Sequence, residues 1–244
     1  MIPVETLSPW SVVFFDLDGT IVDSAPGITS RIAASLVELG HPRPTDAQLR
    51  SYVGPPILDG FRNISGLSDS EADEALRHYR SRVAEVGPEH DSALYPGVAE
   101  ILGELSLRGI PLALSTSKPE SQAVRILRHY GLTGFFTVIC GASEDEVRSS
   151  KADVVAEAIR RLGALGIAAH PGVLVGDRVM DVEGAAAHGL SSILVRWGYG
   201  SAEEERGATA AVDTPVQLAE LLGLAAPVPR GLPSTADAAG GGAS

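Results

Sequence analysis

Short apolar runs alternate with segments of helical periodicity through most of the chain. Runs of aliphatic, β-branched and aromatic residues predict buried strands at residues 11–15, 111–115, 136–140, 173–175 and 192–195. Apolar positions at helical spacing predict helices over residues 98–108, 152–162 and 181–189, and a further helix that ends near Tyr130. The strands are apolar on both faces, so helices must cover both sides of the sheet. The pattern therefore predicts an α/β fold with a doubly wound, Rossmann-like parallel sheet.

One long block departs from this alternation. Residues 24–93 have helical periodicity and contain no convincing strand. A first helix is expected over residues 26–40, and capping boxes at Thr45 and Ser68 begin two more. The last of these places four apolar side chains on one face and ends at Gly87, the four being Leu76, Tyr79, Val83 and Val86.

This block divides the chain into domains. We expect residues 1–22 and 94–224 to form the sheet domain and residues 23–93 to form an inserted helical domain. Residues 225–244 are rich in Ala, Gly, Ser and Pro, a composition that cannot build a core, so a disordered tail is predicted there.

Composition narrows the possible functions. The 244 residues carry a net charge of −12, which disfavours a nucleic acid polymer as partner because that surface repels phosphate backbones. A small phosphorylated substrate stays possible, since a few cations and a metal ion can reverse the local field. The single cysteine, Cys140, excludes an internal disulfide and is expected in the core. No apolar run is long enough to cross a membrane and no secretory signal is evident, so a cytoplasmic protein is predicted. The sequence does not indicate the oligomeric state.

The basic residues are unusual in kind. Among 19 basic residues, Lys118 and Lys151 are the two lysines, and all the others are arginine. Lysine places a compact point charge on a phosphate or carboxylate, a role that the guanidinium group does not duplicate. These two positions therefore merit attention as candidate site residues.

Polar side chains follow several predicted strands at the point where each strand ends. They are Asp16 and Asp18, with Gly19 behind them, then Thr116 and Ser117, then Asp177 and Asp181, and Lys151 begins a helix. Taken singly, each has a structural explanation as a turn, a helix cap, a solvated helix start or a surface ion pair. Because the carboxyl ends of parallel strands meet at one edge of the sheet, we expect these groups to lie together. Carboxylate oxygens of this kind suit Mg²⁺.

Four of these segments carry a family resemblance. Residues 16–24, 114–119, 150–152 and 175–181 resemble the four motifs of the haloacid dehalogenase superfamily, in the family's order. The helical insert resembles the C1-type cap of that superfamily, and the resemblance extends over residues 12–222. Residues 53–56 and 197–200 resemble the branch that contains phosphoglycolate phosphatases and bacterial 5′-nucleotidase-like proteins. Arg178 stands where several relatives have a small polar residue.

The resemblance implies a role for each motif residue. Asp16 would be the nucleophile that forms an aspartyl-phosphate, and Asp18 would protonate the leaving oxygen. The remaining implied roles are phosphate binding by Thr116, Ser117 and Lys151; Mg²⁺ binding by Asp16, Asp177 and the backbone carbonyl of Asp18; and support by Thr20, which would orient Asp18, and Asp181. The implied enzyme is a Mg²⁺-dependent phosphatase acting on a small phosphorylated metabolite, with phosphoglycolate and nucleoside 5′-monophosphates both open.

Several other functions are alternatives to a phosphatase. A phosphonoacetaldehyde hydrolase needs a lysine in the cap, and both lysines lie outside residues 23–93. A haloacid dehalogenase does not need Asp18. A sugar phosphomutase shares all four motifs and would need cap cations, for which Arg31, Arg50 and Arg62 are candidates. A receiver-type phospho-accepting signalling domain is the alternative outside the enzymes, and the helical insert speaks against it.

Overall fold

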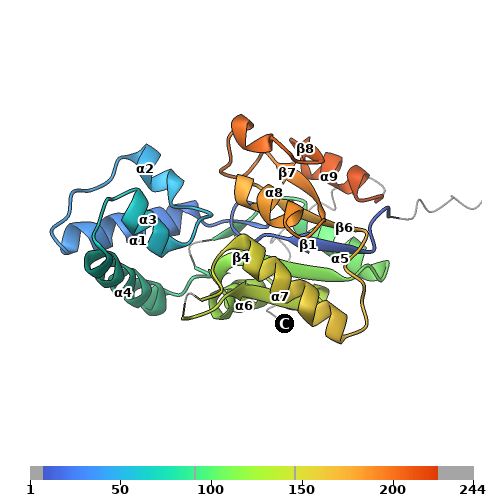
Figure 1. Cartoon of the computed structure of the whole chain (residues 1–244), viewed down its shortest axis with the longest axis horizontal. Coiled ribbons are helices and arrows are strands. Elements are labelled where there is room, and N and C mark those ends of the chain that lie inside the picture. The colour runs from blue at the N-terminus through green and yellow to red at the C-terminus, as the bar shows by residue number, and fades with distance from the viewer. Residues whose placement is uncertain (1–7, 91, 146, 225–244) are drawn as a thin grey trace, which may run out of the picture.

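The architecture is an open parallel sheet with a helical unit inserted after its first strand (Figure 1). This computed structural model describes residues 8–90, 92–145 and 147–224. The predicted tail, residues 225–244, lies outside the described residues. The sheet has six parallel strands in the order β5-β4-β1-β6-β7-β8. Their bounds are β1 (Val12–Phe15), β4 (Leu112–Pro119), β5 (Val138–Ala142), β6 (Gly172–Gly176), β7 (Ser191–Val195) and β8 (Ala210–Val212).

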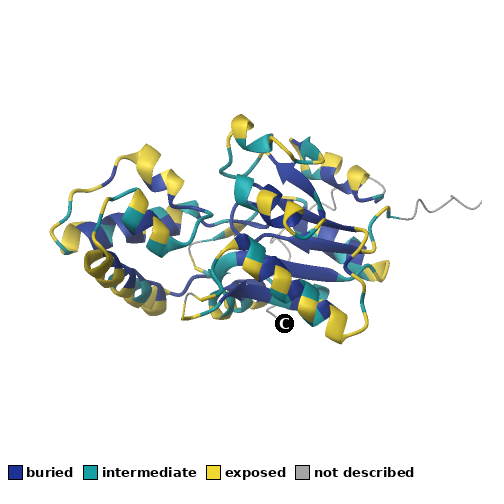
Figure 2. Cartoon of the chain, in the orientation of Figure 1, coloured by how far each residue is buried: buried dark blue, intermediate teal, exposed yellow. Residues whose placement is uncertain are grey.

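Helices cover both faces of this sheet, as the apolar strands require. Side chains of β1 alternate between two cores, with Val13 and Phe15 in one and Val12 and Phe14 in the other. The first core is closed by α5 (Val98–Leu107), α6 (Glu120–His129) and α9 (Pro215–Leu221). The second is closed by α7 (Lys151–Ala164) and α8 (Val179–Ala186). The strands consequently form a buried layer between exposed helix faces (Figure 2). The predicted doubly wound α/β fold is confirmed.

The inserted helical unit has a core of its own. It consists of α1 (Ala25–Glu38), α2 (Asp46–Ser51), α3 (Ile57–Asn63) and α4 (Asp69–Val86), and it lies beside the sheet in Figure 1. The capping boxes predicted at Thr45 and Ser68 are both present. At its centre, the rings of Tyr52 and Phe61 pack edge to face with 5.6 Å between centroids. We refer to α1–α4 as the helical unit.

Two short strands join the helical unit to the sheet. β2 (Val22–Asp23) and β3 (Ala93–Leu94) pair antiparallel, so the outgoing and returning chains run side by side. They fall at the two domain boundaries expected from the sequence. The division at these boundaries stays a prediction, although the separate core of the helical unit agrees with it.

Several details differ from the sequence prediction. Val86, expected on the buried face of α4, is 52% exposed because the helix ends there, beyond its last packed turn. The helix α3 and the final pair β8 and α9 were not predicted, since each is short and has a weak apolar pattern. β4 continues to Pro119 through an irregularity after Ser115, so residues 116–118 lie within this strand. The remaining helical elements are the 3₁₀ turns η1 (Thr133–Phe135) and η2 (Ala202–Glu205).

Among the described residues, none of the helices combines the length and the apolar character needed to cross a bilayer.

Candidate active site

A tight turn after β1 presents Asp16 and Asp18 at the carboxyl end of the sheet. The carbonyl of Leu17 accepts hydrogen bonds from the backbone N–H groups of Ile21 and Val22, at 2.9 and 3.0 Å. Gly19 has a φ of +82° and lies against Asp177, and a β-carbon at this position would be 2.2 Å from the Asp177 Oδ2 atom. Glycine is therefore required both for the turn and for the approach of Asp177.

Lys151 joins two of the predicted carboxylates. Its Nζ atom lies 2.7 Å from Oδ1 of Asp16 and 2.8 Å from Oδ1 of Asp181, and it donates a hydrogen bond to the carbonyl of Ser115 at 3.0 Å. Lys151 is the first residue of α7, as predicted, and Ser150 caps that helix. An opposite charge at this distance favours the ionised form of a carboxyl group, so Lys151 lowers the pKa of Asp16.

Three carboxylates form a compact buried cluster. One oxygen each from Asp16, Asp177 and Asp181 lies within 4.8 Å of the others. Asp177 accepts a hydrogen bond from the backbone N–H of Tyr199 at 2.7 Å. Asp181 accepts from the N–H groups of Asp177 and Arg178 at 3.1 and 3.0 Å, so it caps α8 and also contacts Lys151.

Burial makes the negative charge of this cluster costly. Desolvation raises the pKa of Asp16 to about 6, although the ammonium group of Lys151 opposes the shift. Desolvation, together with the charges of Asp181 and Asp16, raises the pKa of Asp177 well above its usual range. A group of hard oxygen ligands with surplus buried negative charge fits a divalent cation such as Mg²⁺, which would offset that charge. The residues present are thus suited to the metal predicted from the sequence.

Asp18 is held separately, on the side that faces the helical unit. Its Oδ1 atom accepts a hydrogen bond from the hydroxyl of Ser24, and its Oδ2 atom lies 3.0 Å from Nζ of Lys118. The side chains of Lys118 and Asp18 are only 7% and 10% exposed. The Asp18 carboxylate is therefore fixed at both oxygens.

Thr20 does not occupy the expected position. The resemblance implies that its hydroxyl orients Asp18, but the hydroxyl instead donates a long, 3.5 Å hydrogen bond to Oδ1 of Asp177. The turn at Gly19 directs Thr20 toward β6 and leaves Asp18 to Ser24. The prediction that the Thr20 hydroxyl contacts Asp18 is therefore wrong.

Ser24 and Lys118 are the contacts of Asp18 that sequence reasoning missed. Lys118 carried one usable signal, since it is one of only two lysines in the chain. The sequence gives no signal for the Ser24 contact, because a serine before a helix normally indicates a helix cap.

A cavity opens beside Asp18, between the sheet and the helical unit. Asp18, Ser117 and Lys118 line it from the sheet side, and Tyr52 and Tyr79 line it from the helical unit. Its volume is about 40 Å³, enough for a few water molecules.

The phosphate-binding residues expected on β4 lie at different depths. Ser117 lines the cavity, whereas Thr116 is buried and its hydroxyl accepts a hydrogen bond from the N–H of Lys118 at 3.2 Å. The predicted role of Thr116 in binding a phosphoryl group stays a prediction.

The three arginines considered for a phosphomutase lie in different places. Arg62 pairs with Asp69 at 2.9 Å on the outside of the helical unit, and Arg50 is exposed. Arg31 is buried, donates to the carbonyl of Gly87 at 3.2 Å and lines a smaller adjoining cavity. Arg80, not one of these three, lines the cavity next to Asp18.

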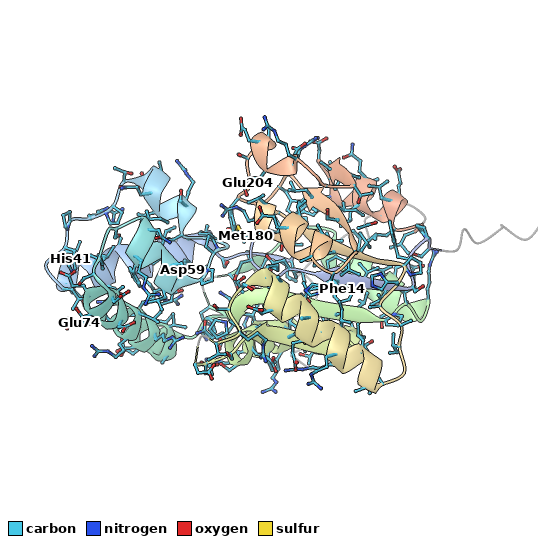
Figure 3. All side chains as sticks on the ribbon, viewed as in Figure 1. Phe14, His41, Asp59, Glu74, Met180 and Glu204 are labelled. Atoms are coloured by element: carbon cyan, nitrogen blue, oxygen red, sulfur yellow. The ribbon has the colours of Figure 1, made fainter. Side chains whose placement is uncertain are left out.

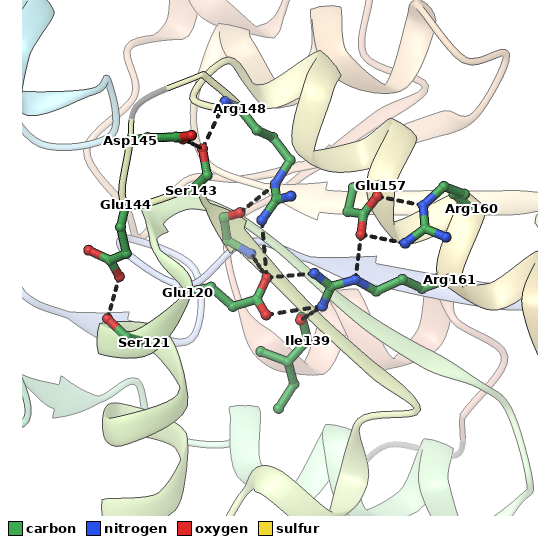
Figure 4. Close-up of polar contacts among 11 residues, drawn as sticks. Glu120, Ser121, Ile139, Ser143, Glu144, Asp145, Arg148, Glu157, Arg160 and Arg161 are labelled. Carbon is green, nitrogen blue, oxygen red and sulfur yellow. Dashed lines mark hydrogen bonds and ion pairs between the residues drawn. The ribbon is translucent and has the colours of Figure 1, made fainter.

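An ionic network supports the elements that carry Lys118 and Lys151 (Figure 4). Glu120 directly follows β4 and accepts from Arg161 of α7 at 3.0 Å and from Arg148 at 3.4 Å. Arg161 also donates to the carbonyl of Ile139 at 2.8 Å, and Arg148 donates to that of Gly141 at 3.0 Å. The network fixes the start of α6, the strand β5 and the loop before Lys151 relative to one another.

Comparison with known proteins places this geometry in a family. The family model described as haloacid dehalogenase-like hydrolase matches residues 13–195. The tyrosine-protein kinase PtkA of Mycobacterium tuberculosis is 44% identical over 192 residues, which cover 79% of this chain. This match spans only 64% of the length of PtkA.

Two further relatives carry phosphatase names. The 5′-nucleotidase of Pseudomonas aeruginosa is 36% identical over 80% of this chain and 86% of its own length. The phosphoglycolate phosphatase of Yersinia pestis is 31% identical over 78% and 83%. The crystal structure of a predicted phosphatase from Clostridium acetobutylicum superposes with a TM-score of 0.80 at 33% identity, covering 86% of this chain and 97% of that one. The resemblance found in the sequence is confirmed at the level of the family and of the branch.

Proposed function

The chain belongs to the haloacid dehalogenase-like hydrolase family, and from this premise we propose that it is a Mg²⁺-dependent phosphatase of small phosphomonoesters. The observation that carries the proposal is the position of Lys151, 2.7 Å from Asp16 inside a buried acidic cluster. A carboxylate that attacks an anionic phosphate must have its charge offset, and Lys151 is placed to do this at the nucleophile itself. The names of the relatives support phosphoglycolate or a nucleoside 5′-monophosphate as the substrate class.

In the first step, a carboxylate oxygen of Asp16 attacks phosphorus. The new bond joins that oxygen to phosphorus, and the bond from phosphorus to the leaving oxygen breaks in line with it. Asp18 donates a proton to the leaving oxygen, which departs as an alcohol. Lys151 stays beside Asp16 throughout and balances charge on the transferred group, while Thr116 and Ser117 donate hydrogen bonds to its oxygens.

In the second step, water hydrolyses the aspartyl-phosphate. Asp18, now ionised, accepts a proton from the water as its oxygen bonds to phosphorus. The bond between phosphorus and the Asp16 oxygen breaks and releases inorganic phosphate. Asp16 and Asp177, with the backbone carbonyl of Asp18, would hold Mg²⁺, which when bound supplies positive charge to the phosphoryl oxygens.

The helical unit, residues 23–93 in the predicted division, acts as a cap in this proposal. It covers Asp18 and encloses a cavity too small for most leaving groups. Opening would admit the substrate, and closure would exclude bulk water from the reacting groups.

A panel of phosphomonoesters tests this function. Phosphate release is measured with Mg²⁺, with EDTA, and with Asp16→Asn in place of the wild type. Isomerisation of a glucose phosphate without an added phosphate acceptor would instead indicate a phosphomutase. Activity that survives both EDTA and Asp16→Asn would contradict the proposed mechanism, and stable phosphorylation of Asp16 without turnover would favour the receiver-type alternative.

The likeness to PtkA supports a second candidate, phosphoryl transfer to a tyrosine hydroxyl. In that reaction a nucleoside triphosphate is the donor, its terminal phosphoryl group moves to the tyrosine oxygen, and the displaced proton passes to a base such as Asp18. Incubation with labelled ATP and a tyrosine-containing protein substrate, followed by phosphotyrosine detection, separates this activity from hydrolysis. The cavity beside Asp18 would have to open to admit a tyrosine side chain of a protein substrate.

A further inference from the structure

The hydroxyl of Tyr199 lies at the start of the helical unit, although Tyr199 itself belongs to the segment after β7. It accepts hydrogen bonds from the backbone N–H groups of Ser24 at 2.8 Å and Ala25 at 3.1 Å, and it donates to Oδ1 of Asp23 at 2.7 Å. Burial and the hydrogen bond to Asp23 raise the pKa of Tyr199. The hydroxyl therefore stays protonated and keeps all three contacts at neutral pH.

The Ser24 side chain does not act as an ordinary helix cap. Ser24 occupies the N-cap position of α1, where a serine hydroxyl normally accepts an N–H bond from the first turn. Its side chain makes no such bond here. The hydroxyl is turned away from the helix and donates to Oδ1 of Asp18. Tyr199 accepts from the N–H groups of Ser24 and Ala25, and Asp23 also accepts from that of Ala25, at 3.2 Å.

The Ser24 contacts bear on Asp18. Tyr199 holds the backbone N–H of Ser24, and the Ser24 hydroxyl, which makes no cap bond, holds one carboxylate oxygen of Asp18, while Lys118 holds the other. Ser24 is 4% exposed, so water does not readily substitute for its hydroxyl. The backbone N–H of Tyr199 also donates to Asp177 at 2.7 Å, which fixes Tyr199 itself against the acidic cluster.

We infer that Ser24 and Tyr199 are positioning residues that orient the carboxyl group of Asp18 for proton transfer to the leaving oxygen. The inference rests on the proposed phosphatase function. Tyr199 acts through Ser24, and Ser24 acts through Asp18, so neither touches the substrate. Loss of either hydroxyl lets the Asp18 carboxylate rotate, and proton transfer suffers while attack by Asp16 does not.

The leaving group provides the test. A p-nitrophenolate departs without a proton, whereas the alkoxide of an alkyl phosphate such as glycerol 2-phosphate needs one. We compare kcat/KM, which reports the steps up to departure of the leaving group and excludes the later hydrolysis of the aspartyl-phosphate, where Asp18 acts for both esters alike. We expect Tyr199→Phe and Ser24→Ala to lower kcat/KM for the alkyl ester about tenfold, a part of the 10²- to 10⁴-fold effect typical of general acids. For p-nitrophenyl phosphate we expect kcat/KM to change by less than about twofold. Asp18→Asn should lower activity on the alkyl ester selectively as well, but by a larger factor. That factor is the reference for the losses in the two other variants.

A matched variant controls for the loss of a partly buried tyrosine hydroxyl. Tyr130 donates its hydroxyl to the carbonyl of Ser92, away from Asp18, so Tyr130→Phe should leave the ratio of the two kcat/KM values unchanged. Equal losses on both esters, or no loss in either variant, would overturn the inference. A wild-type protein that hydrolyses neither ester would instead contradict the proposed function. Each variant removes one oxygen atom, and circular dichroism establishes that the fold is retained.

Discussion

The ammonium nitrogen of Lys151 lies 2.7 Å from Oδ1 of Asp16, and both side chains are at most 5% exposed. A buried charge that loses its partner is strongly unfavourable, by about 3–5 kcal/mol in comparable cases. We therefore expect Lys151→Met to lower the free energy of unfolding by an amount of this order. Its phosphatase kcat should fall at least about 10²-fold, because the charge of Asp16 is no longer offset.

Chemical denaturation and steady-state kinetics check both effects. Lys151→Arg retains the charge and serves as the comparison. The Cγ atom of Lys151 lies only 2.7 Å from where a β-carbon on Gly184 would sit, so space around this side chain is limited. Arginine is expected to recover less than a tenth of the lost activity. Full activity in Lys151→Met would show that the contact with Asp16 is unnecessary.

Metal binding and pH should affect stability together. The pKa of Asp16 is raised to about 6 and that of Asp177 is raised well above its usual range, in both cases first by burial. Each of these carboxyl groups therefore binds its proton more tightly in the folded protein than in the unfolded chain. Without metal, the free energy of unfolding should decrease as the pH rises from about 4, where unfolded aspartate ionises, through the folded pKa values. A divalent cation removes this penalty, so Mg²⁺ should raise Tm more at about pH 7.5 than at about pH 5.

The Asp177→Asn variant tests this prediction directly. It removes a buried negative charge while preserving the shape of the side chain. Its Tm without metal at about pH 7.5 should exceed that of the wild type, and the stabilisation by Mg²⁺ should disappear. Asp73 is exposed, and Asp73→Asn should behave as the wild type in both respects. Thermal unfolding at the two pH values measures all three proteins, and a Mg²⁺ shift retained in Asp177→Asn would contradict the assignment.

The carboxyl edge of the sheet was predictable because strand ends are local. Asp16, Asp177 and Lys151 each follow a recognisable apolar run or begin a recognisable helix, and parallel pairing brings such ends together whatever the loops do. The helical unit was predictable for a similar reason, since two capping boxes mark its helices.

Contacts that depend on distant segments were not predictable in this way. Tyr199 reaches the backbone N–H of Ser24 across 175 positions of sequence, and the Ser24 side chain does not make the cap bond that the local sequence favours. Thr20 was assigned to Asp18 from the family resemblance, but the turn at Gly19 points it to Asp177. β8 was missed because its short run of small side chains has no strong strand pattern.

Gly198 provides a steric test of the acidic cluster. A β-carbon at this position would lie 2.4 Å from Cβ and Oδ2 of Asp177 and 2.5 Å from the carbonyl oxygen of Gly19. We expect Gly198→Ala to displace Asp177 and to weaken Mg²⁺ binding at least about tenfold, corresponding to about 1.4 kcal/mol. Isothermal titration with Mg²⁺ alone measures this without relying on activity.

Gly163 is the matched control for the same substitution. It lies in α7, and a β-carbon there would meet nothing within 4 Å. Gly163→Ala should leave Mg²⁺ affinity unchanged and raise stability by about 0.5–1 kcal/mol through helix propensity. Equal Mg²⁺ affinities in the two variants would mean that Asp177 tolerates displacement or does not bind the metal.

Arg178 connects the sheet to the helical unit at a second place, away from β2 and β3. Its guanidinium group donates to the carbonyl of Val53 and pairs with Glu204 at 2.9 Å. Glu204 and Met180 lie on the side of the sheet domain toward the helical unit (Figure 3). A β-carbon on Gly54 would be 3.0 Å from Arg178, so the two segments are in close contact. We expect Arg178→Ala to loosen the helical unit and to increase amide hydrogen exchange around residues 52–57 severalfold, with a higher KM.

Arg196 offers the matched comparison for this contact. It pairs with Glu205, the neighbour of Glu204, at 2.6 Å and with Asp213 at 3.0 Å, and both partners lie on the sheet side. Arg196→Ala removes an ion pair of the same type without a contact to the helical unit, and such pairs contribute at most about 1 kcal/mol. Its exchange at residues 52–57 should equal that of the wild type. If both variants exchange alike in this segment, Arg178 does not hold the helical unit in place.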